Sequence, residues 1–188
     1  MKKMYLLLSV LFLIYWGCED ITPTEVTLWG VVYSVENTTE LDLYNNQLTG
    51  PIPSEIGNLT NLTYLNLGDN QLTGFIPSEI GYLTNLTSLS LMINQLTGSI
   101  PPEIGNLTNL TYMNLGWNQL TGSIPSEIGS LTNLFAFVVG NNQLTGIIPD
   151  EICNQGDSSP SLQNNQLCPP YPSCIEDYVG EQDTSDCP

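Results

Sequence analysis

The side chains that most often perform catalysis or bind nucleic acid are scarce in this sequence of 188 residues. It has no histidine, and its only basic residues, Lys2 and Lys3, stand at the start of the chain. Beyond position 3, no imidazole can act as a general base or metal ligand, no lysine can form a Schiff base, and no cation can neutralise phosphates. The composition therefore argues against an enzyme and against a protein that binds nucleic acid.

Carboxylates are the abundant reactive groups, with 19 Asp and Glu and a formal net charge of −17. Five glutamates recur at a spacing of 24 residues, namely Glu55, Glu79, Glu103, Glu127 and Glu151. Such a column could attract Ca²⁺, but this ion takes about six to eight oxygen ligands, and one Glu per repeat supplies too few. Each Glu follows a proline at the start of an expected helical turn, whose free N–H groups favour a carboxylate. We therefore expect no metal and no cofactor.

The five cysteines divide into one near the N-terminus and four near the C-terminus. Lys2 and Lys3 precede an apolar run over residues 4–16, which is typical of a secretory signal and is shorter than the roughly 20 residues of a membrane span. In an exported protein, the even set of Cys153, Cys168, Cys174 and Cys187 predicts two disulfides. A zinc site is the rival hypothesis, but the spacings lack Cys-x-x-Cys pairs.

The body of the chain is a repeat that must build the elements of the fold. Five glycines lie 24 residues apart, each within the phrase Gln-Leu-Thr-Gly-x-Ile-Pro: Gly50, Gly74, Gly98, Gly122 and Gly146. Upstream of each glycine runs the frame Leu-x-x-Leu-x-Leu-x-x-Asn-x-Leu, as at residues 62–72. A fixed period of this length indicates a solenoid. Leu-x-Leu predicts a strand with one buried face, and the remainder of each unit is long enough only for a helical or 3₁₀ turn.

The recurring leucines and asparagines have physical reasons. The leucines of one coil are expected to stack on those of the next and form a continuous core. The asparagines fall where the chain leaves each strand, where a buried amide can bond backbone groups that have no other partner. They are Asn46, Asn70, Asn94, Asn118, Asn142 and Asn165. We interpret this column as structural.

The phrase Leu-Thr-Gly-x-Ile-Pro-x-Glu-Ile-Gly-x-Leu-x-Asn-Leu resembles the plant-specific leucine-rich repeats of receptor-like kinases and polygalacturonase-inhibiting proteins, over residues 38–168. The resemblance implies an α/β solenoid: a right-handed superhelix with a concave parallel β-sheet, short 3₁₀ or helical turns on the convex side, and a cap at both ends. It also implies a non-catalytic extracellular recognition module that binds a protein, peptide or glycan on the concave face.

These observations divide the chain into four segments. Residues 1–17 are expected to be a signal peptide, 18–37 an N-terminal cap, 38–156 five leucine-rich repeats, and 157–188 a degenerate sixth repeat with a disulfide-bonded C-terminal cap. The segment from Cys168 to Cys174 resembles the cysteine-bearing caps of plant-type repeats. That likeness implies pairing of Cys168 with Cys174 and of Cys153 with Cys187, although four cysteines allow three connectivities.

Gly17-Cys18, followed by two acidic residues, resembles the signal of a bacterial lipoprotein, in which the cysteine becomes the lipidated first residue. The resemblance implies a bacterial exported protein that is anchored through Cys18 at the cell surface or outer membrane. The alternative is ordinary signal-peptidase cleavage nearby, which would give a secreted protein. In either case we expect a monomer. A lipid on Cys18 would be its only contact with a membrane.

Binding residues are predicted from the register of the repeat, because the side chains between the leucines face the concave side. On the middle coils this surface collects aromatic, methionine and isoleucine side chains: Tyr64, Met92, Ile93, Tyr112 and Trp117. Such side chains on a rigid exposed sheet are the usual anchors of an interface. The alternative is that they merely cover the sheet.

Threonine offers a second functional hypothesis. Two files recur with the repeat, one at Thr49, Thr73, Thr97, Thr121 and Thr145, the other at Thr60, Thr84, Thr108 and Thr132. If neighbours lay at the strand spacing of about 4.8 Å, the files would resemble the flat threonine arrays of ice-binding proteins. The sequence therefore leaves an ice-binding or adhesive surface protein as an alternative to a recognition module.

Overall fold

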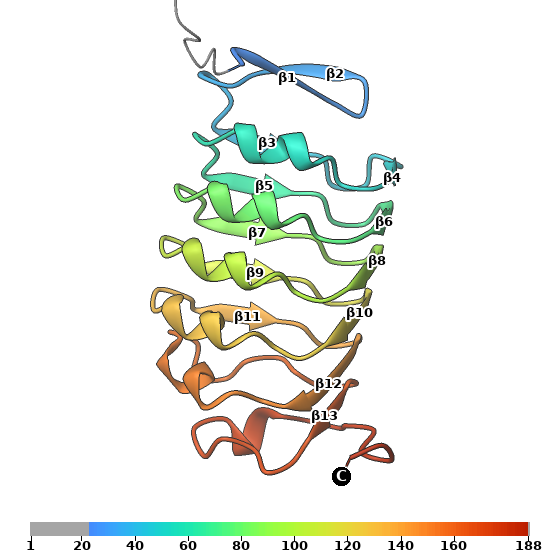
Figure 1. Ribbon diagram of the computed structural model, residues 1–188, viewed down its shortest axis with the longest axis vertical. Helices are drawn as coiled ribbons and strands as arrows, with labels where there is room; N and C mark the ends of the chain where they lie inside the picture. Colours follow the sequence, from blue (N-terminus) through green and yellow to red (C-terminus); the bar gives the residue numbers. More distant parts are fainter. Residues whose placement is uncertain (1–22, 188) are drawn as a thin grey trace, which may run out of the picture.

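The computed structural model of the chain is a solenoid that runs from an N-terminal hairpin to a C-terminal cap (Figure 1). It describes residues 23–187, so the expected signal peptide and Cys18 lie outside the described residues. Each of five coils contains a strand of a first sheet, a strand of a second sheet and a 3₁₀ helix, in that order. The predicted solenoid is thus confirmed, and the short turn expected in each unit is a 3₁₀ helix.

The first sheet is parallel and lines the concave side, with the strand order β11-β9-β7-β5-β3. Its strands are β3 (Glu40–Asp42), β5 (Tyr64–Asn66), β7 (Ser88–Ser90), β9 (Tyr112–Asn114) and β11 (Ala136–Val138). The register advances by one whole repeat per strand, so that Tyr64 pairs with Ser88 and Ser88 pairs with Tyr112. The central residue of each strand is buried, and its two neighbours face the concave side.

The second sheet is also parallel and runs along one edge of the solenoid. Its strands are β4 (Thr49–Gly50), β6 (Gln71–Gly74), β8 (Gln95–Gly98), β10 (Gln119–Gly122), β12 (Gln143–Ile147) and β13 (Gln166–Cys168). Here Thr73 pairs with Gln95, and Thr97 pairs with Gln119. Successive threonines are therefore offset by two residues, which places them about 8 Å apart instead of about 4.8 Å. The expected strand spacing of this threonine file is wrong.

The convex side carries a stack of 3₁₀ helices: η1 (Ser54–Asn58), η2 (Ser78–Tyr82), η3 (Pro102–Asn106), η4 (Ser126–Ser130) and η5 (Asp150–Asn154). Each begins directly after a proline in extended conformation, and the repeated glutamate lies in its first turn. The Glu79 carboxylate accepts a hydrogen bond from the Ser78 hydroxyl at 3.3 Å. The glycine of each of the first four helices allows close stacking: a Cβ on Gly81 would lie 2.6 Å from the Glu103 carbonyl oxygen.

The leucines and isoleucines of all five coils form one continuous buried core. The asparagine column closes the turn after the strand as predicted from Asn70 onward, whereas Asn46 in the first coil is exposed and its amide donates to the Tyr44 carbonyl. Asn70 Oδ1 accepts hydrogen bonds from the backbone N–H groups of Asn46 and Leu48, and its Nδ2 donates to the Leu43 and Leu67 carbonyls. Asn94, Asn118, Asn142 and Asn165 repeat this arrangement. Adjacent coils are therefore joined by hydrogen bonds of the asparagine side-chain amides as well as by apolar packing.

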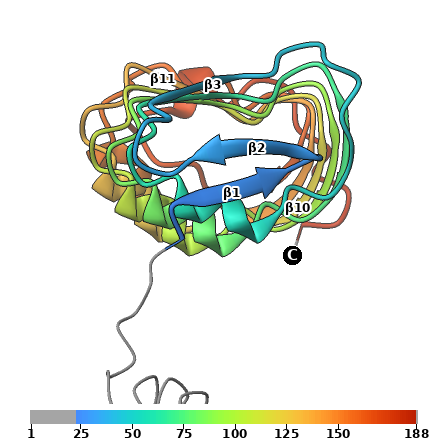
Figure 2. The same ribbon diagram turned by 90° about the horizontal axis from the view of Figure 1, so that it is seen from above.

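An antiparallel hairpin of β1 (Glu25–Leu28) and β2 (Val31–Ser34) lies across the open end of the first coil (Figure 2). Val26 and Leu28 are buried against the core. Trp29 and Gly30 form the turn, both with positive φ (46° and 82°), which suits the right-handed twist of a tight hairpin. The hairpin thus shields the leucines of the first coil from water.

The C-terminal tail folds back over the last coil and includes η6 (Glu176–Tyr178). All four predicted cysteines form disulfides, but the expected pairing is wrong: Cys153 pairs with Cys174, and Cys168 pairs with Cys187. Cys168 lies in β13 and Cys153 lies in η5, on the convex side. The chain crosses from the second sheet to η5 between Cys168 and Cys174. Each disulfide therefore joins the C-terminal tail to the solenoid, whereas the expected Cys168–Cys174 pair would have closed a loop within the tail.

Candidate functional site

The predicted binding residues lie on the second, third and fourth coils of the concave side. The structure brings four of them into two neighbouring pairs. Met92 and Tyr112 both contact Asn114, whose Nδ2 donates to Met92 Sδ at 3.3 Å and to Tyr112 Oη at 3.0 Å. Ile93 and Trp117 occupy the same position on adjacent coils, and the Asn94 N–H donates to the Trp117 carbonyl at 3.1 Å. Tyr64 stands apart from Tyr112, with Ser88 paired between them.

The two tyrosines are positioned by identical local arrangements. In the second coil, Asn66 Nδ2 donates to Tyr64 Oη at 3.3 Å, while Asn66 Oδ1 accepts from the Gly68 N–H at 3.1 Å. In the fourth coil, Asn114 makes the same two bonds, at 3.0 Å to Tyr112 and 3.0 Å from Gly116. Because each asparagine donates to the tyrosine oxygen, the phenolic hydrogen remains for another acceptor. Each pair therefore presents a fixed aromatic ring with a hydrogen-bond donor.

Ile93 and Trp117 have unusual backbone conformations, with φ of 53° and 57°. The corresponding position in the other coils is held by Asn or Asp, also at positive φ: Asn45, Asp69, Asn141 and Asn164. Asn and Asp tolerate the left-handed region, whereas a β-branched or bulky residue there costs about 1–2 kcal/mol. The Ile93 side chain is 41% exposed and that of Trp117 is 63% exposed. Core packing therefore does not account for these residue types.

Phe135 belongs to the same surface but was not predicted from the sequence. Its ring centroid lies 6.4 Å from that of Tyr112, at an interplanar angle of 45°, and its side chain is 69% exposed. The same repeat position is threonine in preceding coils, where the hydroxyls of Thr63, Thr87 and Thr111 donate to the backbone of the coil before. The replacement of a hydrogen-bonding threonine by an exposed aromatic was the available signal.

Small residues form the floor between these side chains. Gly68 is flanked by Tyr44 and Met92, whose side-chain carbons lie 3.3 and 3.2 Å from the place where its Cβ would be. Gly116 and Gly140 lie on adjacent coils, and both are buried. Tyr112 and Phe135 stand where the strands begin, and Ile93 and Trp117 stand just after they end. We call these four residues, together with Met92, the apolar concave patch.

Negative charge lies on the first two coils of the concave side. Glu40 and Asp42 are exposed on β3, and Asp69 is half-buried in the turn after β5. On the next three strands, the positions equivalent to Glu40 and Asp42 hold uncharged residues: Ser88, Tyr112, Ala136, Ser90, Asn114 and Val138. The concave side is therefore acidic at its N-terminal end and apolar further along.

Two side chains with a shifted pKa lie in the N-terminal hairpin and the C-terminal tail. Burial raises the pKa of Tyr33 in the hairpin, and hydrogen bonds from Ser185 lower the pKa of Asp183 in the tail. Neither group lies on the concave side. Within residues 23–187, no group of three or more His, Cys, Asp or Glu side chains could hold a metal ion. The same residues include no helix long and apolar enough to cross a membrane.

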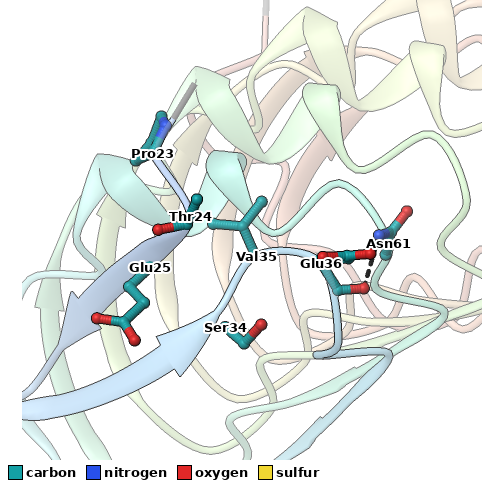
Figure 3. Close-up of a pocket in the computed structure, with 7 residues that line it drawn as sticks. All are labelled: Pro23, Thr24, Glu25, Ser34, Val35, Glu36 and Asn61. Carbon is teal, nitrogen blue, oxygen red and sulfur yellow. Dashed lines mark hydrogen bonds between the residues drawn. The ribbon is translucent and has the colours of Figure 1, made fainter. Parts of the chain in front are cut away.

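A hollow of about 420 Å³ lies at the N-terminal end, between the hairpin and the second coil (Figure 3). Its lining includes two carboxylates, those of Glu25 and Glu36. Asn61 Nδ2 donates to the Glu36 carbonyl at 2.9 Å, the same bond that Asn85 makes to Thr60 one coil later. The polar contacts of this hollow therefore belong to the joint between coils.

Family patterns match most of the repeat region. The Leucine rich repeat family matches residues 36–96, and a second Leucine Rich Repeat pattern matches residues 109–131 and 133–155. No curated protein matches the sequence. Together with the solved structures described next, these matches show that the chain belongs to the leucine-rich repeat proteins of the plant type.

Three solved structures illustrate the relationship. The ectodomain of the receptor kinase GASSHO1/SCHENGEN3 from Arabidopsis thaliana, in complex with CASPARIAN STRIP INTEGRITY FACTOR 2, is 42% identical over 73% of this chain and 17% of its own, with a TM-score of 0.71. The BIR2 ectodomain from the same plant is 31% identical over 84% of this chain and 86% of its own, with a TM-score of 0.64.

The third is the Arabidopsis receptor kinase HAESA in complex with the peptide hormone IDA and the co-receptor SERK1, 31% identical over 77% of this chain and 29% of its own, with a TM-score of 0.61. This chain thus spans less than a third of GASSHO1/SCHENGEN3 and of HAESA, and most of BIR2. All three relatives are plant proteins, so they give no support to the expected bacterial source. The BIR2 and GASSHO1/SCHENGEN3 structures are those of ectodomains, and this chain shares their leucine-rich repeat fold.

Proposed function

We propose that this chain binds a peptide or an extended segment of a protein on the concave side of its third to fifth coils. The anchors are the predicted residues Met92, Ile93, Tyr112 and Trp117, joined by Phe135. Tyr64 borders this surface from the second coil. A glycan is the other ligand class that an exposed aromatic surface of this kind would suit.

The observation that supports the proposal most is the backbone conformation of Ile93 and Trp117. Both residues have positive φ at a position where Asn or Asp serves in the other coils. Two adjacent coils therefore carry an unfavourable residue type, and both side chains extend into solvent. Strain of this kind points to function when neither stability nor packing accounts for it.

The relatives support the same assignment. HAESA is bound to a peptide hormone and a co-receptor, and GASSHO1/SCHENGEN3 is bound to CASPARIAN STRIP INTEGRITY FACTOR 2. Their repeat domains are recognition modules, and this chain shares the repeat. The ice-binding alternative lacks comparable support, because the threonines of the second sheet are out of register with one another.

The test is selection of a displayed library of random linear peptides on the mature chain. Peptides that it enriches should lose binding to the Tyr112→Ala/Trp117→Ala variant. The matched control is Phe75→Ala/Tyr82→Ala, which removes two exposed aromatics outside the concave sheet. Equal loss in both variants, or enrichment of glycans but no peptides in a parallel glycan array, would contradict the proposal.

We further propose that the mature protein is an exported monomer. The disulfides and the extracellular nature of the relatives support export. Lipidation at Cys18 and the segment boundaries at residues 17, 37 and 156 remain proposals from the sequence. The mass of the mature N-terminal peptide tests them, because an acylated Cys18 and an unmodified N-terminus near it have different masses.

A further inference from the structure

We infer that the bound segment is cationic, and that its basic side chains lie over the first two coils while an apolar side chain contacts Ile93 and Trp117. This inference rests on the proposed function and specifies the chemistry and orientation of the partner. Three features of the structure carry it: the position of the acids, the complete lack of cations beyond Lys3, and the distance between the acids and the apolar concave patch.

The acids are placed where a ligand on the apolar concave patch would extend. Glu40 and Asp42 flank the buried Leu41 on β3, so both side chains face the concave side. Asp69 holds the position that Ile93 and Trp117 hold on the next two coils. A ligand that contacts Trp117 and continues across the strands toward the N-terminal end therefore reaches three carboxylates.

The protein can attract a cation but cannot pair with an anion. No Lys, Arg or His follows Lys3, so a carboxylate or phosphate on the partner would find no opposite charge along the concave side. A partner lysine or arginine would find Glu40, Asp42 and Asp69 without a competing cation. Because like charges across an interface cost free energy and opposite charges steer association, the charge distribution selects basic partners.

The geometry also sets the spacing in the ligand. Strand β3 lies three strands from β9, which corresponds to about 14 Å at the spacing of strands in a sheet. An extended peptide advances about 3.3 Å per residue. Trp117 also lies three residues beyond the end of β9, so a basic residue over Glu40 and Asp42 is expected at least about four or five residues from the residue that contacts Trp117.

The repeat itself supplies two of the substitutions that remove these charges and keep the fold. Asn66 and Asn114 occupy the position of Asp42 and accept the backbone N–H two residues later, the bond that Asp42 Oδ1 makes with Tyr44. Asn141 has the backbone conformation of Asp69. The variant Glu40→Gln/Asp42→Asn/Asp69→Asn thus removes three charges: Asn is already used at the second and third positions, and Gln keeps the size of the exposed Glu40 side chain. Glu79→Gln/Glu103→Gln/Glu127→Gln removes three charges from the convex side and is the matched control.

The experiment uses the linear peptides enriched by the full mature chain, measured by calorimetry at low and at physiological ionic strength. We expect the enriched peptides to carry Lys or Arg at least about four or five residues from an apolar residue. Their affinity should fall about tenfold in the concave variant and less than about twofold in the convex one, with a smaller difference at higher salt.

Two negative results have different meanings. If the enriched peptides bind the Trp117→Asn variant as tightly as the unchanged protein, the proposed function itself fails. If they require Trp117 but carry no excess of Lys and Arg, or if the concave and convex charge variants bind them equally, the proposed function stands and the inference of a cationic partner is wrong.

Discussion

The side-chain amide of Asn114 donates a hydrogen bond to the Tyr112 hydroxyl at 3.0 Å, and through it the tyrosine is fixed to the turn that follows its own strand. The Asn114 oxygen accepts from the Gly116 N–H at 3.0 Å, and the amide also contacts Met92 Sδ. One polar side chain thus holds both an aromatic and a methionine of the apolar concave patch. Rigid anchors of this kind lose little conformational entropy when a partner binds.

Replacing Asn114 by Ala should therefore destabilise the fold modestly. The bonds to Tyr112 and from Gly116 are lost at about 1 kcal/mol each, and the weak bond to Met92 Sδ adds little, so the free energy of unfolding should fall by about 1–2 kcal/mol in urea titrations. Asn66→Ala is the matched variant, because Asn66 makes the same two bonds in the second coil. Equal stability losses are expected, but only Asn114→Ala should also weaken peptide binding. A loss below about 0.5 kcal/mol would contradict this role.

Close stacking of the convex helices predicts that Gly81→Ala is destabilising. The added Cβ would lie 2.6 Å from the Glu103 carbonyl oxygen and 2.7 Å from Glu103 Cβ, so adjacent coils must separate. Overpacking of this kind costs about 1–3 kcal/mol, which thermal unfolding can measure. Tyr82→Ala, at the next residue, removes an exposed side chain and should change stability by less than about 0.5 kcal/mol. Similar effects for the two variants would be evidence against tight stacking.

The buried Asp157 closes the end of the concave sheet. Its Oδ2 accepts a hydrogen bond from the Phe137 N–H at 2.8 Å, and its Oδ1 accepts from the Ser159 N–H at 2.9 Å. Asp157→Ala leaves the Phe137 N–H without this partner in a buried position, and we expect a loss of about 1–3 kcal/mol in the free energy of unfolding. Ser158→Ala, at the adjacent exposed residue, is the control. An unchanged urea midpoint for Asp157→Ala would show that water replaces the carboxylate.

The fold could be predicted because its structural positions recur four or five times in the sequence. The leucines, the asparagine column and the glycine of the first four 3₁₀ helices recur at one spacing, and the register of the concave sheet follows the same spacing. The second sheet has a shorter offset between its strands, so the spacing of the repeat alone gave the wrong distance between Thr73 and Thr97.

Features that occur once were harder to predict. The C-terminal tail has no second copy, and its crossing from β13 to η5, which decides the disulfide pairing, depends on tertiary packing. Within the candidate site, the register located Tyr112 and Trp117, but the left-handed conformation of Ile93 and Trp117 required the backbone. Phe135 was missed because its column lies just before the strand, outside the concave columns that the register defines.

We propose that Trp117 is maintained for binding at a cost in stability, and the variant Trp117→Asn tests this most directly. Asn suits the positive φ of this position, so we expect the melting temperature to stay the same or rise by up to about 4 °C. Binding of the enriched peptides should be lost in the same preparation. A fall in melting temperature together with unchanged peptide binding would show that Trp117 serves the fold, and would contradict the account.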